Sequence, residues 1–186
     1  MIHNTKQTVS KSLMLNCFIM LMSTLITLNT AQAGGRFKAK GTKTNAAGGV
    51  TSVRAAGASG QNGGGFMRAR GSTTNGQGQA AGGGATAVKG ANGGKGFRAG
   101  SYTADSSGNV NYSGAAAATG ANGSAATTGG FSRGSDGSIR GSRSTTATAN
   151  NGNSYSGNTT YDNNGVSHTQ NCYNASGQEI KCPTKN

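Results

Sequence analysis

The stretch that decides the fold is Phe97-Arg-Ala-Gly-Ser-Tyr-Thr-Ala-Asp-Ser-Ser-Gly-Asn-Val-Asn-Tyr-Ser113. Two short runs with alternating Tyr, Thr and Val side chains flank a central Asp-Ser-Ser-Gly sequence. Thr and Tyr are favoured in strands, and Gly supplies the positive φ that tight hairpin turns require. The stretch therefore predicts two strands joined by a turn.

Further turn signals follow it towards the C-terminus at short and fairly regular intervals. They are Asp136-Gly137, Asn150-Asn-Gly152, Asn163-Asn-Gly165 and Ala175-Ser-Gly177. The segments between them are rich in Ser, Thr and Tyr, and no helical i, i+3, i+4 apolar spacing persists. We therefore predict that residues 97–186 are β-rich, as a meander or a solenoid-like repeat.

The composition predicts a low-complexity Gly-rich repeat protein without a conventional hydrophobic core. All 34 glycines follow residue 33, and that part contains no Leu or Trp. Burying a large apolar side chain gains about 1.5–3 kcal/mol, whereas ordering each residue costs about 1–2 kcal/mol. Either the isolated chain is disordered, or backbone hydrogen bonds and stacking stabilise it. The basic Gly/Ala-rich region 34–96 is expected to be the more flexible part, with disorder as one alternative.

Residues 1–33 read as a secretory signal peptide. A cationic start is followed by an apolar stretch from Leu13 to Leu28 and by Ala31-Gln32-Ala33, a small-x-small cleavage pattern. An uncleaved anchor and a lipid anchor on Cys17 are the alternatives. The prediction is an exported protein, located outside the cell, at the cell surface or in the periplasm, with no transmembrane segment in the mature chain.

Two cysteines remain after the signal, Cys172 and Cys182. An even number in an exported chain predicts one disulfide, and the turn signal between them predicts that it closes a small hairpin. Half of a metal site is the alternative, but His168 is the only histidine after the signal.

Self-similarity is the most informative feature of the mature chain. Its four phenylalanines, at positions 37, 66, 97 and 131, follow Gly closely and precede a base within two positions. Their nearly even spacing indicates a degenerate repeat of about 30 residues. The candidate residues for polyanion binding or for assembly are Phe37, Lys38, Phe66, Arg68, Phe97, Arg98, Phe131 and Arg133.

The charge is strongly positive and unevenly distributed. The chain has a formal net charge of +13, and residues 34–98 contain ten basic residues and no acid. Such a region attracts polyanions, although charge that only keeps a low-complexity chain soluble is the simpler interpretation. We find no carboxylate pair, no metal-ligand cluster and no nucleophile motif, and therefore expect no enzymatic activity and no cofactor.

Three functions fit these features. The first is an exported structural or surface-associated protein that self-assembles or contributes to an extracellular matrix or envelope. The second is a cationic binder of extracellular polyanions such as DNA or anionic polysaccharide, since Phe beside Lys or Arg among glycines resembles in kind the Gly-rich segments that bind single-stranded nucleic acid. A Gly-rich antimicrobial or ice-binding protein is the third.

Overall fold

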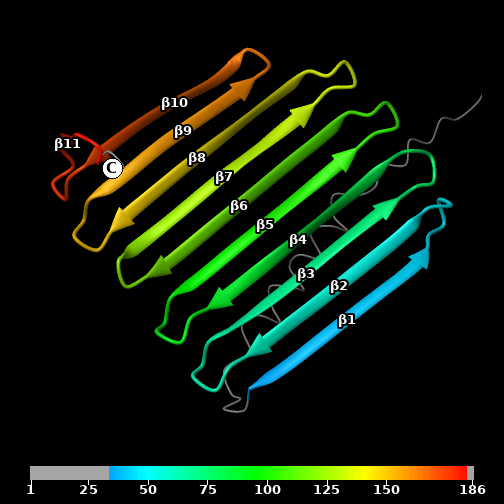
Figure 1. Cartoon of the computed structure of the whole chain (residues 1–186), viewed down its shortest axis with the longest axis horizontal. Coiled ribbons are helices and arrows are strands. Elements are labelled where there is room, and N and C mark those ends of the chain that lie inside the picture. The colour runs from blue at the N-terminus through cyan, green and yellow to red at the C-terminus, as the bar shows by residue number, and fades with distance from the viewer. Residues whose placement is uncertain (1–33, 184–186) are drawn as a thin grey trace, which may run out of the picture. The chain divides into compact units, whose positions relative to one another are not determined.

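The computed structural model describes residues 34–183, which form one antiparallel sheet of eleven strands in sequence order (Figure 1). The predicted signal peptide lies outside the described residues. The strands are β1 (Gly35–Thr44), β2 (Val50–Ser59), β3 (Gly65–Thr74), β4 (Ala80–Lys89), β5 (Lys95–Ala104), β6 (Val110–Gly120), β7 (Gly123–Arg133), β8 (Ile139–Ala149), β9 (Ser154–Asp162), β10 (Gly165–Tyr173) and β11 (Glu179–Ile180). The fold is therefore all-β, and of the two predicted arrangements it is the meander.

The repeating unit is one strand and one turn. Strands β1 to β6 begin at equal intervals along the chain, because each of the first five has ten residues and is followed by a turn of five. The fourth turn residue is a glycine with φ between 74° and 89°, at Gly48, Gly63, Gly78, Gly93 and Gly108. The longer repeat expected from the Phe spacing thus corresponds to two units, after which the chain runs in the same direction again.

Side-chain hydrogen bonds close several of the turns. In the first turn, the Asn45 Oδ1 atom accepts the backbone N–H groups of Ala47 at 3.1 Å and Gly49 at 3.0 Å. The Gly48 N–H donates to the Asn45 carbonyl oxygen at 3.1 Å. Turn residues of this kind set the register of the two strands that they join. The same side-chain acceptor geometry recurs at Asn75, Asp105 and Asn174.

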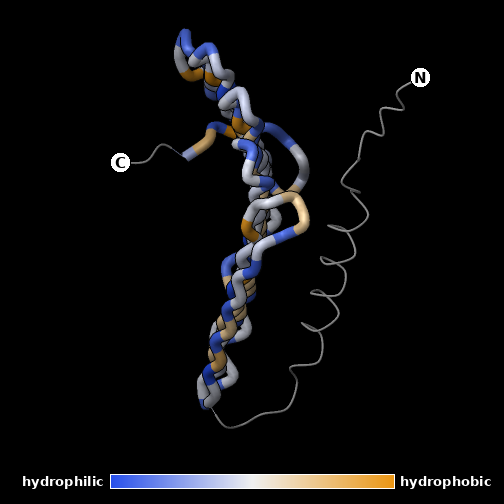
Figure 2. The backbone as a smooth tube through the Cα atoms, turned by 90° about the vertical axis from the view of Figure 1, so that its right-hand side faces the viewer, coloured by the Kyte–Doolittle hydropathy of each residue, from blue (hydrophilic) through white to orange (hydrophobic). Residues whose placement is uncertain are grey.

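The sheet is a single layer, as its edge-on view shows (Figure 2). Among the described residues, the buried hydrophobic ones are Ala56 and Cys172, which are 8% and 4% exposed. Both faces of a single layer meet solvent. The backbone ladder and the cross-strand side-chain pairs therefore supply the stabilisation that a core supplies elsewhere.

The region 34–96 differs from the sequence-based expectation. Strands β1 to β4 occupy it and are as long as β5, so the alternative of disorder there was wrong. That expectation rested on the Gly and Ala content, which disfavours individual strands. The evenly spaced turns outweigh it, because each turn aligns all of one strand with the next.

The predicted C-terminal hairpin is confirmed. Strand β10 turns at Asn174–Gly177 and pairs with β11, where Cys172 lies opposite Ile180. Cys172 and Cys182 are joined by a disulfide, with their Cα atoms 5.2 Å apart.

Candidate functional site

The sheet has two chemically different faces. Alternate residues of a strand point to opposite faces, and directly paired residues of neighbouring strands share a face, so the pairings define rows of side chains across the sheet. We call one of them the basic row, and the face that carries it the cationic face; the opposite face is the neutral face. The basic row consists of Lys40, Arg54, Arg70, Gly84, Gly100, Gly114, Gly129, Arg143, Thr159 and His168.

The cationic face gathers most of the positive charge of the strands. Nine exposed cationic residues lie on it, namely Arg36, Lys38, Lys40, Arg54, Arg68, Arg70, Arg98, Arg133 and Arg143. The two strand carboxylates, those of Asp162 and Glu179, belong to rows of the neutral face. Like charges on one surface without a compensating carboxylate produce a strong positive potential there.

The neutral face is different in kind. Its central row has Ala39, Ala55, Ala69, Ala85, Ala99 and Ala115 at its first six positions. Its cationic residues Lys43, Lys89, Lys95 and Arg140 lie in rows near the strand ends. The charge of the sheet is thus separated by face and is not spread evenly over both.

The structure places the four basic residues predicted from the sequence on one face. Lys38, Arg68 and Arg98 are evenly spaced in sequence and fall into one row of the cationic face, on β1, β3 and β5. They are two strand spacings apart, about 10 Å. Arg133 lies on the same face in another row, opposite Val110 and Ile139.

The predicted phenylalanines do not form one row. Phe37 and Phe97 share a row of the neutral face, separated by three strands. Phe66 and Phe131 lie on the cationic face in different rows, opposite Val88 and Tyr112 respectively. The sequence intervals between the four phenylalanines are unequal. The rings therefore fall at different positions along their strands and on different faces.

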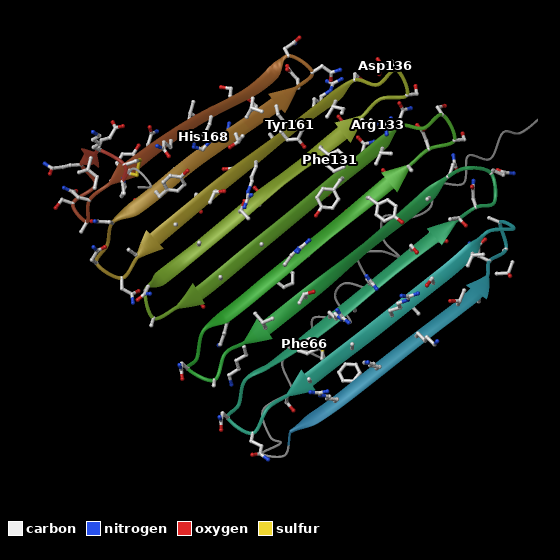
Figure 3. The ribbon with its side chains drawn as sticks, in the orientation of Figure 1. Phe66, Phe131, Arg133, Asp136, Tyr161 and His168 are labelled. Atoms are coloured by element: carbon white, nitrogen blue, oxygen red, sulfur yellow. A yellow bond between two sulfur atoms is a disulfide. The ribbon has the colours of Figure 1, made fainter. Side chains whose placement is uncertain are left out.

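Sequence reasoning missed the aromatic residues of the cationic face. The residues Tyr102, Tyr112, Phe131, Gly141 and Tyr161 are directly paired in succession from β5 to β9, and we call them the aromatic row. Figure 3 shows the rings of Phe131 and Tyr161 on β7 and β9. The regular spacing of the turns was the signal available, because it fixes which residues pair.

A shallow hollow of about 480 Å³ lies on the cationic face over β4 to β8. Ala116, Ala118 and Ala125 contribute to its lining, together with Arg98 and Arg143. The Arg143 Nε atom donates to the Thr127 Oγ1 atom at 3.0 Å, which fixes the direction of this guanidinium. The hollow is therefore a small-residue surface with two guanidinium groups among the residues that line it.

The carboxylates of residues 34–183 lie in turns or on the neutral face. The pKa of Asp136 is lowered, first by the hydrogen bond of the Ser138 side chain, and Asp136 lies in the turn after β7. Among residues 34–183, no group of three His, Cys, Asp or Glu side chains could hold a metal ion. The arrangement suits binding by charge and stacking.

In the part of the chain that the structure describes, no helix is long and apolar enough to cross a membrane. Compared with known proteins, the chain matches no family model, no curated protein and no solved structure.

Proposed function

We propose that this chain is an exported, non-enzymatic protein whose cationic face binds extended anionic polymers. The separation of charge carries this proposal: nine exposed cationic residues share the face on which no strand carboxylate lies. A flat surface with several cations in register can contact many charges of a linear polymer at once. Charge that served solubility alone would not need to be collected on one face.

The test compares two variants of equal net charge. Lys40→Gln, Arg54→Gln and Arg70→Gln together remove three charges from the basic row. Lys43→Gln, Lys89→Gln and Lys95→Gln remove three from the neutral face and serve as the control. Dextran sulfate is titrated into the wild type and both variants at several salt concentrations, after far-UV circular dichroism has shown that all three are folded.

We expect the basic-row variant to bind more weakly than the control. The logarithm of affinity falls linearly with the logarithm of salt concentration, and each lost contact lowers the slope by about one. The slope of the basic-row variant should therefore fall by about two to three, and that of the control by less than one. An equal effect of both variants would show that net charge, and not the cationic face, determines binding.

A structural, self-associating role is the second candidate, because β1 has an unpaired outer edge. All ten residues of β1 are exposed, and among residues 34–183 its one partner strand is β2. An open edge presents unpaired N–H and C=O groups to which another strand can add. Four cations on β1, at Arg36, Lys38, Lys40 and Lys43, oppose the addition of a second β1.

A further inference from the structure

The aromatic row presents a series of accessible rings. Tyr102, Tyr112 and Phe131 follow one another on three neighbouring strands and are 38%, 36% and 39% exposed. The ring centres of Tyr112 and Phe131 are 5.6 Å apart, and their planes are inclined by 26°. Tyr161 continues the row two strands further on, after Gly141.

Glycines allow these rings to lie against the backbone. A Cβ atom at Gly100 would come within 2.6 Å of the Tyr112 hydroxyl, and one at Gly82 within 2.7 Å of the Tyr102 ring. Any larger residue at these positions would lift the ring from the sheet. The rings of Tyr102 and Tyr112 therefore each have one side against the strands, while more than a third of each residue remains exposed.

The basic row runs beside the aromatic row. The two rows are separated by two residues along each strand, which corresponds to about 7 Å. Lys40, Arg54 and Arg70 occupy the basic row on β1 to β3, and Arg143 occupies it on β8. Between these charged ends the row consists of Gly84, Gly100, Gly114 and Gly129.

We propose that these two rows together bind single-stranded nucleic acid. This inference rests on the proposed function and names the polyanion. Bases stack on the outer sides of Tyr102, Tyr112 and Phe131, while the phosphates follow the basic row. The end of the Tyr112 ring lies over Gly100 and Gly114, so the chain passes its hydroxyl there. Gly84 and Gly129 keep the surface low on either side, and the charged residues at both ends hold the sugar-phosphate chain.

The spacing of the rings favours an extended single strand over a duplex. Neighbouring strands are about 4.8 Å apart, which exceeds the rise of about 3.4 Å between stacked bases in duplex DNA. Bases that each cover one ring must therefore unstack from one another. A single strand allows this, whereas a duplex keeps its bases stacked. The single sheet formed by residues 34–183 also contains no helix that could enter a groove. An anionic polysaccharide would use the basic row equally well, but it has no bases to stack on the aromatic row.

The experiment separates base stacking from charge. Tyr112→Leu with Phe131→Leu removes two rings of the aromatic row and retains apolar bulk. Phe37→Leu with Phe97→Leu removes two rings of the neutral face and is the matched control. Affinities for a fluorescein-labelled thymidine dodecamer and for dextran sulfate are measured by anisotropy and by competition at one salt concentration, with a DNA duplex of the same length as a third ligand.

Each stacked base contributes roughly 5- to 150-fold to affinity. We therefore expect the aromatic-row variant to bind the dodecamer at least about 25-fold more weakly and dextran sulfate within about twofold of the wild type. The control should bind both as the wild type does. An unchanged dodecamer affinity, an equal loss in the control, or duplex binding as tight as dodecamer binding would overturn base stacking and leave the proposed function intact.

Two results in the wild type complete the test without depending on a variant that folds. Tyrosine fluorescence should be quenched by the dodecamer and unchanged by dextran sulfate, because only bases cover the rings. Quenching that is absent, or equal for both polymers, would contradict the stacking proposal. Failure of the wild type to bind either polymer would overturn the proposed function as well.

Discussion

The carboxylate of Asp105 accepts two hydrogen bonds from Asn109, one from its side-chain amide at 2.7 Å and one from its backbone N–H at 3.0 Å. These residues are the first and the last of the turn between β5 and β6. The Ser107 N–H donates to the same carboxylate at 2.9 Å. The bonds lower the pKa of Asp105, and the Asn109 side chain is the largest cause.

Acid should weaken this turn. Because the folded pKa lies below the ordinary value of 3.8, the stabilisation is fully present above that value and is lost as the pH falls through the lowered pKa. Asp105→Asn keeps an acceptor oxygen, as Asn45 has in the first turn, and does not titrate. The free energy of unfolding of the parent protein should therefore fall below pH 3.8 relative to the variant.

Urea denaturation at a series of pH values measures this difference. The pKa of Asp136 is lowered as well, so both proteins should carry Asp136→Asn. A difference in unfolding free energy that does not change with pH would contradict the claim that the ionised carboxylate stabilises the turn.

Replacement of Gly108 should reveal the backbone cost of the repeated turn. Gly108 has a φ of 89°, and a Cβ atom there would meet nothing within 4 Å. Gly108→Ala should therefore destabilise the sheet through its backbone conformation alone, by about 1–2 kcal/mol. Gly108→Asn should cost less, because Asn tolerates the left-handed region. Urea denaturation measures both variants. An equal loss of unfolding free energy in the two would point to a side-chain clash that this geometry does not contain.

Much of the fold could be predicted from the turn residues. Asp105-Ser-Ser-Gly108 and its counterparts have a mechanism, since the acidic or amide side chain closes the turn and Gly supplies the positive φ. The disulfide between Cys172 and Cys182 followed from the cysteine count. The strands of 34–96 were underestimated, because Gly and Ala give a weak strand signal even where the turns are regular.

The candidate site was harder to predict, because it depends on register. Lys40 and Arg70 become members of one row only when the strands and turns between them keep constant lengths. Tyr102 and Tyr112 lie on successive strands, and only the turn at Asp105 places them opposite each other. The phenylalanines, by contrast, looked equivalent in sequence, yet Phe37 and Phe66 lie on opposite faces of the sheet.

Reduction of the disulfide should release the last strand and leave the others paired. Strand β11 has two residues, and Cys172 and Tyr173 are its partners. Closing a loop of this length stabilises by about 3 kcal/mol in the chain-entropy model. Each strand of this sheet contacts only its neighbours, so loss of the β10–β11 pairing need not unfold the other strands.

Hydrogen exchange of Cys172→Ser with Cys182→Ser tests this expectation. The amide groups of β10 and β11 that face each other should lose protection, and those of β1 to β8 should keep it. Loss of protection throughout the sheet would show that the strands unfold as one cooperative unit.

Neutralising the edge of β1 should promote association of the sheets. Lys38, Lys40 and Lys43 lie on this edge strand, and their charges repel the β1 of another copy. We expect the variant with Thr at all three positions to sediment as larger species while its β spectrum is retained. The wild type should approach this behaviour at high salt, where exposed charges are screened over about 3 Å at 1 M.

The control carries Thr at Lys89, Lys95 and Arg140, which removes the same charge from interior strands and leaves the edge of β1 unchanged. Association of both variants to the same extent would assign the effect to net charge, and association of neither would show that the charges on β1 do not limit edge pairing.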